Sequence, residues 1–223
     1  MIRSERVSES LRLGTILMLT GGFLDSYSYL VRGNVFATAE TGNIVLMGIN
    51  LASGNFEKAR HYLIPIISYV IGIFVAEYIK KNLGEHPKLH WKECVLILEL
   101  VIVLAAGFIP QEGNSVVNCM IAFVCAMQVE AFRRMHGNAF ATTMCTGNLR
   151  SGTELLSVGM LKKEKEKIRS GLSYYWIDLV FVVGAATGAL ICSRFGERSI
   201  WLCCITLLSA LGFIRHEKKN AEV

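Results

Sequence analysis

Two copies of a polar phrase hold residues of this chain that could bind a ligand. Thr-Gly-Asn occurs at 41–43 and again at 146–148, and Phe-Ala-Thr precedes each copy, at 36–38 and 140–142. Threonine and asparagine favour helix N-caps and glycine permits a sharp turn, so each triplet can interrupt a segment and start a short helix. The free N–H groups at such a start attract an anionic group, while exposed carbonyls take a cation.

We therefore expect the two triplets to bind a small solute. The residues concerned are Thr41, Gly42, Asn43, Thr146, Gly147 and Asn148. The alternative is that each triplet is a structural pivot, whose hydroxyl and amide groups satisfy neighbouring backbone and bind no ligand.

Two acidic residues inside apolar runs are further candidates for the site. Asp25 and Glu130 lie 105 positions apart, the spacing that also separates the triplets. A carboxyl group in a medium of low dielectric is driven toward its neutral form and can take up and release a proton. Asp25 has no basic residue within four positions, which predicts a proton carrier. Arg133 and Arg134 follow Glu130 within one helical turn, which predicts an ion pair. The alternative is that both acids only make hydrogen bonds between helices.

Other polar residues also fall inside apolar runs. Gln128 precedes Glu130 on the same run and is included in the predicted site. Glu77, Glu99 and Asp178 carry less weight, and Glu77 lies near Lys80, as expected at a membrane interface.

The composition indicates that these residues lie in a membrane protein. Hydrophobic residues make up 52% of the 223 and charged residues 18%, with a mean hydropathy of +0.43, beyond an ordinary soluble domain. Apolar runs long enough for a hydrocarbon layer predict transmembrane helices. They cover residues 13–31, 62–79, 94–110, 115–132, 172–193 and 199–214. Two shorter segments, 35–52 and 139–158, carry the repeated phrase.

The chain is predicted to be a single membrane domain, 1–223, built by internal duplication. The sequence "AAGFI" at Ala105 is matched by "ALGFI" at Ala210, so the similarity extends to the ends of both halves. The two repeats cover 11–110 and 115–214. If the short segments enter without crossing, each half has three spans, and an odd number inverts the second half relative to the first.

The distribution of Lys and Arg favours this six-span arrangement. With the N-terminus in the cytoplasm, inside loops hold 18 of these residues and outside loops five. Eight spans would give 13 against nine, with Arg150 inside the membrane. Inside loops normally carry the excess. We expect a multi-pass protein of the bacterial cytoplasmic membrane with both termini in the cytoplasm and an uncleaved first span.

Enzyme, metal and nucleic-acid functions find little support. The chain has no HExxH, GxSxG or glycine-rich phosphate loop, and its seven cysteines lack paired metal-ligand spacing, so we expect no catalysis, metal or cofactor. The net charge of +5 is explained by loop charge and predicts no nucleic-acid partner. Gly184 and Gly188 form a GxxxG pattern that predicts close helix packing.

The sequence resembles the YoaK family of bacterial integral membrane proteins, a domain of unknown function. The resemblance rests on "GGFLDSYSYL" and "FATAETGN", followed about a hundred residues later by "AMQVEAF" and "GNAFATTMCTGNL", and it covers nearly the whole chain. Asp25, Gln128 and the paired triplets are its most specific elements. Glu130 departs from the small polar residue expected there. The resemblance implies a membrane protein and no known activity.

These observations predict an all-α polytopic membrane protein with six long transmembrane helices, two short re-entrant or broken helices and two inverted repeats. The function we expect is that of a secondary transporter or channel-like carrier of an unidentified small solute, coupled to protons through Asp25 or Glu130. The alternative is a non-transporting scaffold or accessory subunit. The lipid bilayer is the expected environment, and the sequence leaves a homo-oligomer open.

Overall fold

The computed structural model describes residues 10–84, 90–135 and 137–222. Arg3, Arg6 and Lys88, which contribute to the predicted cytoplasmic charge, lie outside the described residues.

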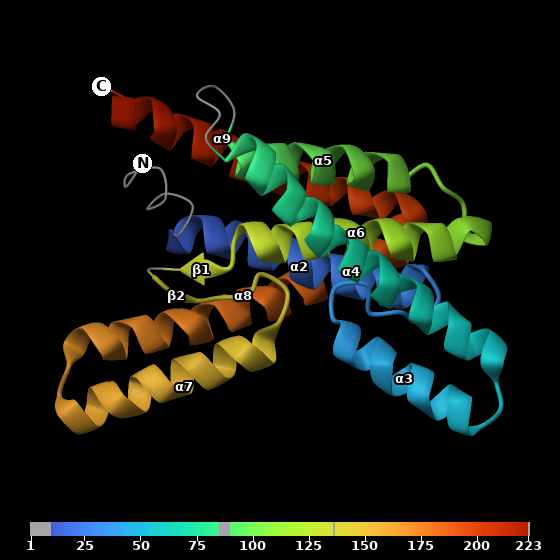
Figure 1. Ribbon diagram of the computed structural model, residues 1–223, viewed down its shortest axis with the longest axis horizontal. Helices are drawn as coiled ribbons and strands as arrows, with labels where there is room; N and C mark the ends of the chain where they lie inside the picture. The colour runs from blue at the N-terminus through green and yellow to red at the C-terminus, as the bar shows by residue number, and fades with distance from the viewer. Residues whose placement is uncertain (1–9, 85–89, 136, 223) are drawn as a thin grey trace.

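Helices make up nearly all of the described chain, which confirms the all-α prediction (Figure 1). They are α2 (Leu11–Val31), α3 (Glu40–Ala52), α4 (Phe56–Leu83), α5 (Trp91–Ala106), α6 (Asn114–Ala131), α7 (Cys145–Lys162), α8 (Lys165–Phe195) and α9 (Trp201–Glu222), with the 3-10 turns η1 (Gln111–Gly113) and η2 (Gly196–Ile200). Two strands of two residues, β1 (Arg134–Met135) and β2 (Asn138–Ala139), pair antiparallel with Arg134 opposite Ala139.

Three helical stretches of the described chain are long and apolar enough to cross a membrane. They cover 56–83, 111–131 and 165–216, and the last contains α8, η2 and the apolar part of α9. The six long spans predicted from the sequence are therefore supported only in part. Helix α5 has 16 residues, fewer than the roughly 20 needed for an upright crossing. Helix α2 has 21, but hydroxyl groups and Asp25 reduce its apolar character.

Local signals explain where several elements begin and where the chain reverses. The side chain of Ser10 caps α2 by accepting from Leu13 N at 3.3 Å. After α2 the chain turns back through Gly33 and Asn34, with φ of +90° and +60°. In the second half Gly137 has φ of +79°. Both Gly-Asn pairs thus provide left-handed backbone conformations before a repeated phrase, where a glycine is least strained.

Helix α2 packs most extensively against α8. The contact is close because glycines lie at the crossing: a β-carbon on Gly184 would be 3.1 Å from the Cα of Leu19, and one on Gly188 would be 3.2 Å from the Cα of Phe23. The predicted role of Gly184 and Gly188 in helix packing is confirmed. A cluster of buried apolar side chains also joins α2 to α5, α6 and α9.

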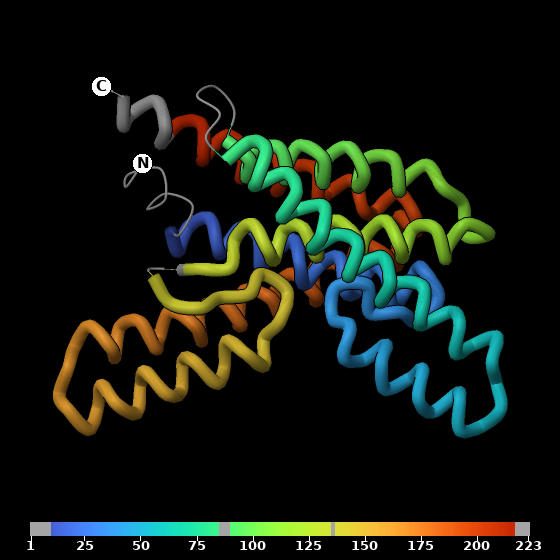
Figure 2. Tube along the Cα trace, viewed as in Figure 1, coloured from blue at the N-terminus to red at the C-terminus, as the bar shows by residue number. Residues whose placement is uncertain are grey.

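The helices alternate in direction through the molecule. In Figure 1, α2, α5 and α8 run from left to right, whereas α6, α9 and, obliquely, α4 run from right to left. Helices α3 and α7 both begin near the centre and run to opposite ends, where they return as α4 and α8 (Figure 2). Contacts between α3 and α4 and between α7 and α8 make each pair a helical hairpin.

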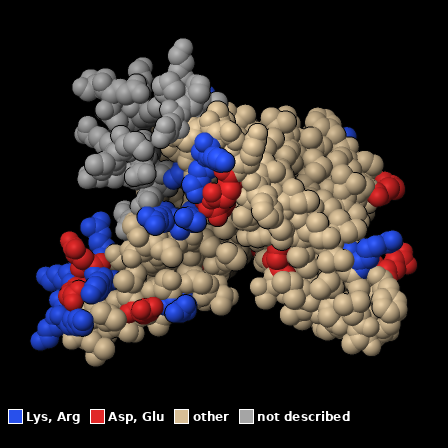
Figure 3. Space-filling model, in the orientation of Figure 1, with Lys and Arg blue, Asp and Glu red and all other residues tan. Residues whose placement is uncertain are grey.

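Large apolar side chains are exposed on the outside of most helices, including Val70 on α4, Val101 on α5 and Val182 on α8. Lys and Arg gather most densely over the end of the α7–α8 hairpin (Figure 3). Smaller charged groups lie in the upper middle and at the right of this face, with broad uncharged surfaces between them. Apolar surface of this extent is unusual in a soluble protein and suits contact with lipid.

Candidate functional site

The repeated triplets lie within the first turns of α3 and α7. Helix α3 begins at Glu40 and α7 at Cys145, so each Thr-Gly-Asn follows one helical residue. The prediction that helices start at the triplets is confirmed, but the predicted capping role is wrong. The N-cap residues are Ala39 and Met144, and neither makes a side-chain capping bond. Each triplet begins one residue inside its helix, so none of its residues occupies the N-cap position.

Asn43 and Asn148 instead tie each helix to the segment before it. The side-chain oxygen of Asn43 accepts from Phe36 N at 3.2 Å, and its nitrogen donates to Phe36 O at 2.8 Å. Asn148 makes the same two bonds with Ala141, at 3.2 and 2.9 Å. Each amide therefore substitutes for a backbone partner and fixes the extended segment that enters the helix.

The two amides differ in their acidic neighbours. The nitrogen of Asn43 also donates to a carboxylate oxygen of Glu40 at 2.9 Å, within the same helix. The nitrogen of Asn148 lies 3.4 Å from a carboxylate oxygen of Asp178 on α8. One acid thus comes from the first turn of α3, and the other from a helix packed against α7.

Asp25 holds the segment that leads into α3. Its carboxylate accepts from Thr38 N at 3.2 Å, and Ser28 on the next turn of α2 accepts from Ala37 N at 3.2 Å. The Asp25 side chain is only 8% exposed. Any change in its charge therefore acts directly on the backbone that precedes α3.

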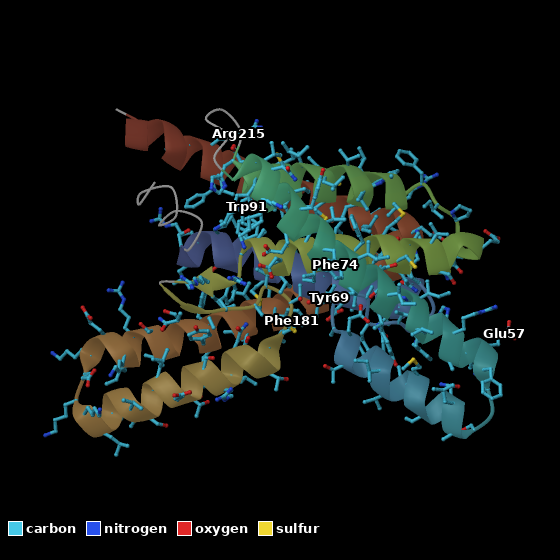
Figure 4. All side chains as sticks on the ribbon, in the orientation of Figure 1. Glu57, Tyr69, Phe74, Trp91, Phe181 and Arg215 are labelled. Atoms are coloured by element: carbon cyan, nitrogen blue, oxygen red, sulfur yellow. The ribbon has the colours of Figure 1, made fainter. Side chains whose placement is uncertain are left out.

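A cavity of about 590 Å³ lies where α3 and α7 begin. Its lining comes from the starts of both helices, from the segment before α7, and from α2 and α8. The residues are Asp25, Ala39, Glu40, Thr41, Ala139, Phe140, Ala141, Thr143, Met144, Cys145, Thr146, Gly147, Asn148, Arg150, Ser151 and Phe181. Figure 3 shows a hollow between the two hairpins, and Phe181 lies near the molecular centre in Figure 4.

The structure brings only part of the predicted site to this cavity. Asp25, Thr41, Thr146, Gly147 and Asn148 line it. Gly42 and Asn43 do not: Gly42 lies against the ring of Phe36, and the Asn43 side chain is fully buried between α3 and its entering segment. The cavity is therefore asymmetric, with the second half contributing more of its phrase than the first.

Gln128 lies away from the cavity lining. Its amide nitrogen donates to Glu99 on α5 at 2.8 Å, and both side chains are buried. Gln128 therefore links α6 to α5. This placement corrects its predicted position in the same site as the triplets, because the buried face of α6 on which it lies is turned toward α5.

Glu130 also lies outside the cavity, although its sequence position matches that of Asp25. It is paired with Arg133 at 3.2 Å and with Lys80 on α4 at 3.8 Å. Lys80 in turn lies 2.7 Å from Glu77. The prediction of an ion pair is correct, and of the two arginines that follow Glu130 it is Arg133 that forms it. Its predicted place in one site with Asp25 is not found, because α6 ends beside α4 and Lys80.

Several lining residues were missed or given little weight by sequence reasoning. Glu40 directly precedes the first triplet, and this position alone could have marked it. Thr143 lies 105 positions after Thr38, so the spacing of the triplets could have indicated it. Phe140 belongs to the repeated phrase, whereas no sequence signal points to Phe181, which the α2–α8 contact brings to the cavity.

The fold and cavity define an all-α membrane protein in which two helices begin at a shared central site. The chain belongs to the family described as protein of unknown function (DUF1275), whose model matches residues 13–213. It is 24% identical over 209 residues to the UPF0700 transmembrane protein YoaK of Bacillus subtilis (strain 168), covering 88% of this chain and 90% of that protein. These matches confirm the family resemblance. No solved structure matches the chain.

Proposed function

We propose that this protein is a secondary transporter of a small solute in the bacterial cytoplasmic membrane, and not an enzyme. The observation that carries the proposal is the central cavity, which is lined by the first turns of α3 and α7 from the two halves of the chain. Non-helical backbone within a membrane is tolerated where it is buried in protein or lines a cavity, and transporters place solute sites at such breaks. A scaffold would need no cavity at this position.

The proposed topology has six crossings, with 11–110 and 115–214 as inverted halves. The alternating directions of α2, α4, α5, α6, α8 and α9 in Figure 1 support it. So does the placement of the basic α7–α8 turn at the same end as the start of α2, the side that the excess of Lys and Arg assigns to the cytoplasm. In this arrangement α3 and α7 begin at the centre and run toward opposite sides of the membrane without completing a crossing.

Asp25 is the proposed proton carrier. It lines the cavity, is largely buried, and accepts a hydrogen bond from the backbone that enters α3. Protonation would weaken this charge-assisted bond, because a neutral carboxyl group is a poorer acceptor. Proton binding would thereby loosen the start of α3 and couple the charge state of Asp25 to the shape of the cavity.

The test is solute-driven proton movement in vesicles that contain the purified full chain and a pH-sensitive dye. A panel of small anionic, cationic and neutral solutes is added, and the wild type should move protons with at least one of them. Asp25→Asn retains an oxygen that can accept from Thr38 N, so it should fold, exchange the solute and lose coupling to the pH gradient. Glu57→Gln, at the far end of α4 (Figure 4), is the matched control and should behave as the wild type.

Two outcomes would contradict these assignments. Unchanged pH-driven uptake by Asp25→Asn would rule out the proton role and leave Asp25 as a hydrogen-bond partner of the segment before α3. Failure of the wild type to move any solute faster than empty vesicles would rule out transport of this panel and favour the scaffold.

A further inference from the structure

The two helices that begin at the cavity both present their N-terminal ends to it. Ala39, Glu40 and Thr41 contribute from the start of α3, and Met144 to Asn148 from the start of α7. The first N–H groups of a helix have no acceptor within the helix, and the aligned peptide dipoles place partial positive charge there. Neither helix start has a side-chain cap that would satisfy these groups.

A buried hydroxyl group at the same place points independently to a ligand. Thr143 precedes α7, lines the cavity and is only 2% exposed. Within the described residues its hydroxyl has no hydrogen-bond partner. Leaving a buried hydroxyl unpaired costs about 1–3 kcal/mol, and an oxygen of a ligand in the cavity would provide the acceptor.

The rest of the lining is largely apolar. Phe140 and Phe181 contribute aromatic rings, and Met144 and Ala39 contribute aliphatic surface. A volume of about 590 Å³ accommodates a small organic molecule and exceeds what an inorganic ion alone would fill. The lining therefore suits a ligand with an oxygen-bearing anionic end and a hydrocarbon part.

The charged groups around the cavity determine in which protonation state it can bind an anionic ligand. Asp25 of α2 and Glu40 of α3 line it, Asp178 of α8 lies behind Asn148, and Arg150 of α7 is the basic residue of the lining. Ionised Asp25 and Glu40 would repel an anion, whereas their protonated forms would not. An anion would thus enter together with a proton.

We propose that the cavity binds a small organic carboxylate, with its oxygens at the starts of α3 and α7 and at Thr143, and its hydrocarbon part against Phe140 and Phe181. The proposal rests on the carrier function and names the class of its solute. Carboxylate and proton would then cross together, with no net charge moved by a monocarboxylate.

Matched probes test this class directly on the purified full chain. Benzoate and benzamide have nearly the same shape and differ in charge, as do lactate and lactamide. Thermal unfolding at fixed pH should show a higher midpoint with the carboxylates and no such rise with the amides, because a ligand stabilises the form it binds. Equal shifts from both members of each pair, or no shift from either carboxylate, would overturn the carboxylate assignment.

Thr143→Val removes the hydroxyl with little change in volume. Without ligand it should be at least as stable as the wild type, because it removes a buried hydroxyl that has no partner among the described residues. It should nevertheless bind benzoate about tenfold more weakly, the loss expected for one hydrogen bond to a charged group. Thr187→Val, whose hydroxyl bonds to Val183 O of its own helix, is the control and should keep the wild-type affinity. An unchanged benzoate affinity in Thr143→Val would show that the Thr143 hydroxyl does not bind the carboxylate.

Lowering the pH should strengthen benzoate binding by the wild type while benzoate itself stays ionised. Asp25→Asn should reduce this dependence, because one of the repelling charges is gone. The vesicle assay separates this proposal from the transport function. If a neutral or cationic solute is moved with protons while carboxylates are not, the carrier function stands and the carboxylate class is wrong.

Discussion

Arg32 donates a hydrogen bond from Nε to the hydroxyl oxygen of Tyr27 at 2.7 Å, and neither side chain is exposed. The other guanidinium nitrogens donate to Pro110 O, Asn114 Oδ1 and Ala106 O, each at 3.2 Å. Among the described residues no carboxylate pairs with Arg32. One of these acceptors, Ala106 O, lies at the C-terminal end of α5, where the helix dipole is negative.

Replacing Arg32 should therefore destabilise the fold strongly. Arg32→Gln should lower the free energy of unfolding by about 3 kcal/mol, since several buried oxygens would lose their donors. Arg32→Lys should rescue little, because an ammonium group cannot reproduce the planar donor geometry. Chemical unfolding in detergent measures both variants.

Arg60→Gln on α4 is the matched control for Arg32, because Arg60 is exposed. It should change the free energy of unfolding by no more than about 0.5 kcal/mol. Similar losses in Arg60→Gln and Arg32→Gln would contradict the structural role assigned to the buried network.

Asn43→Ala should reduce stability without acting through a ligand. Its amide makes three hydrogen bonds, two to Phe36 and one to Glu40, and the side chain is fully buried. We expect a loss of about 1–3 kcal/mol, seen as a lower unfolding midpoint and lower yield. Asn50→Ala, on the same helix with one bond to Leu46 O, should lose less than half as much. A stable Asn43→Ala protein with impaired solute binding would show that Asn43 meets the solute after all.

The α2–α8 crossing should not tolerate a methyl group. In Gly184→Ala the new β-carbon would lie 3.1 Å from the Cα of Leu19, so the helices must separate, and overpacking of this kind costs about 1–3 kcal/mol. Gly48→Ala on α3 is the control, since nothing lies within 4 Å of its added β-carbon. It should gain up to about 1 kcal/mol from helix propensity. The unfolding midpoints of the two variants, each compared with the wild type, measure this difference. Equal effects of the two substitutions would argue against close packing at Gly184.

Topology can be tested at two exposed turns in a variant that lacks the native cysteines. Six crossings place Glu112 outside and Lys163 inside the cell. Glu112→Cys should then react with an impermeant maleimide on intact cells, and Lys163→Cys only after permeabilisation. Protection of Glu112→Cys in intact cells would instead support eight crossings, in which both turns face the cytoplasm.

The sequence allowed the class of protein and the order of its elements to be predicted. Composition and run length are local properties, and each predicted apolar or polar segment contains a helix. The repeated phrase could also be recognised, and with it the two helix starts. Gly33 and Gly137, each followed by Asn, have positive φ, a conformation that restricts which residues fit.

The partners of the polar side chains were decided by tertiary structure. Equivalent sequence positions placed Asp25 and Glu130 in one predicted site, yet Asp25 lines the cavity and Glu130 pairs with Lys80 from α4. Arg32 counted as a loop charge in the topology prediction, but packing buries it against residues more than seventy positions away. A repeated phrase repeats the backbone signals that start a helix, because those depend on near neighbours. It does not repeat the contacts between elements, because each copy packs against different side chains.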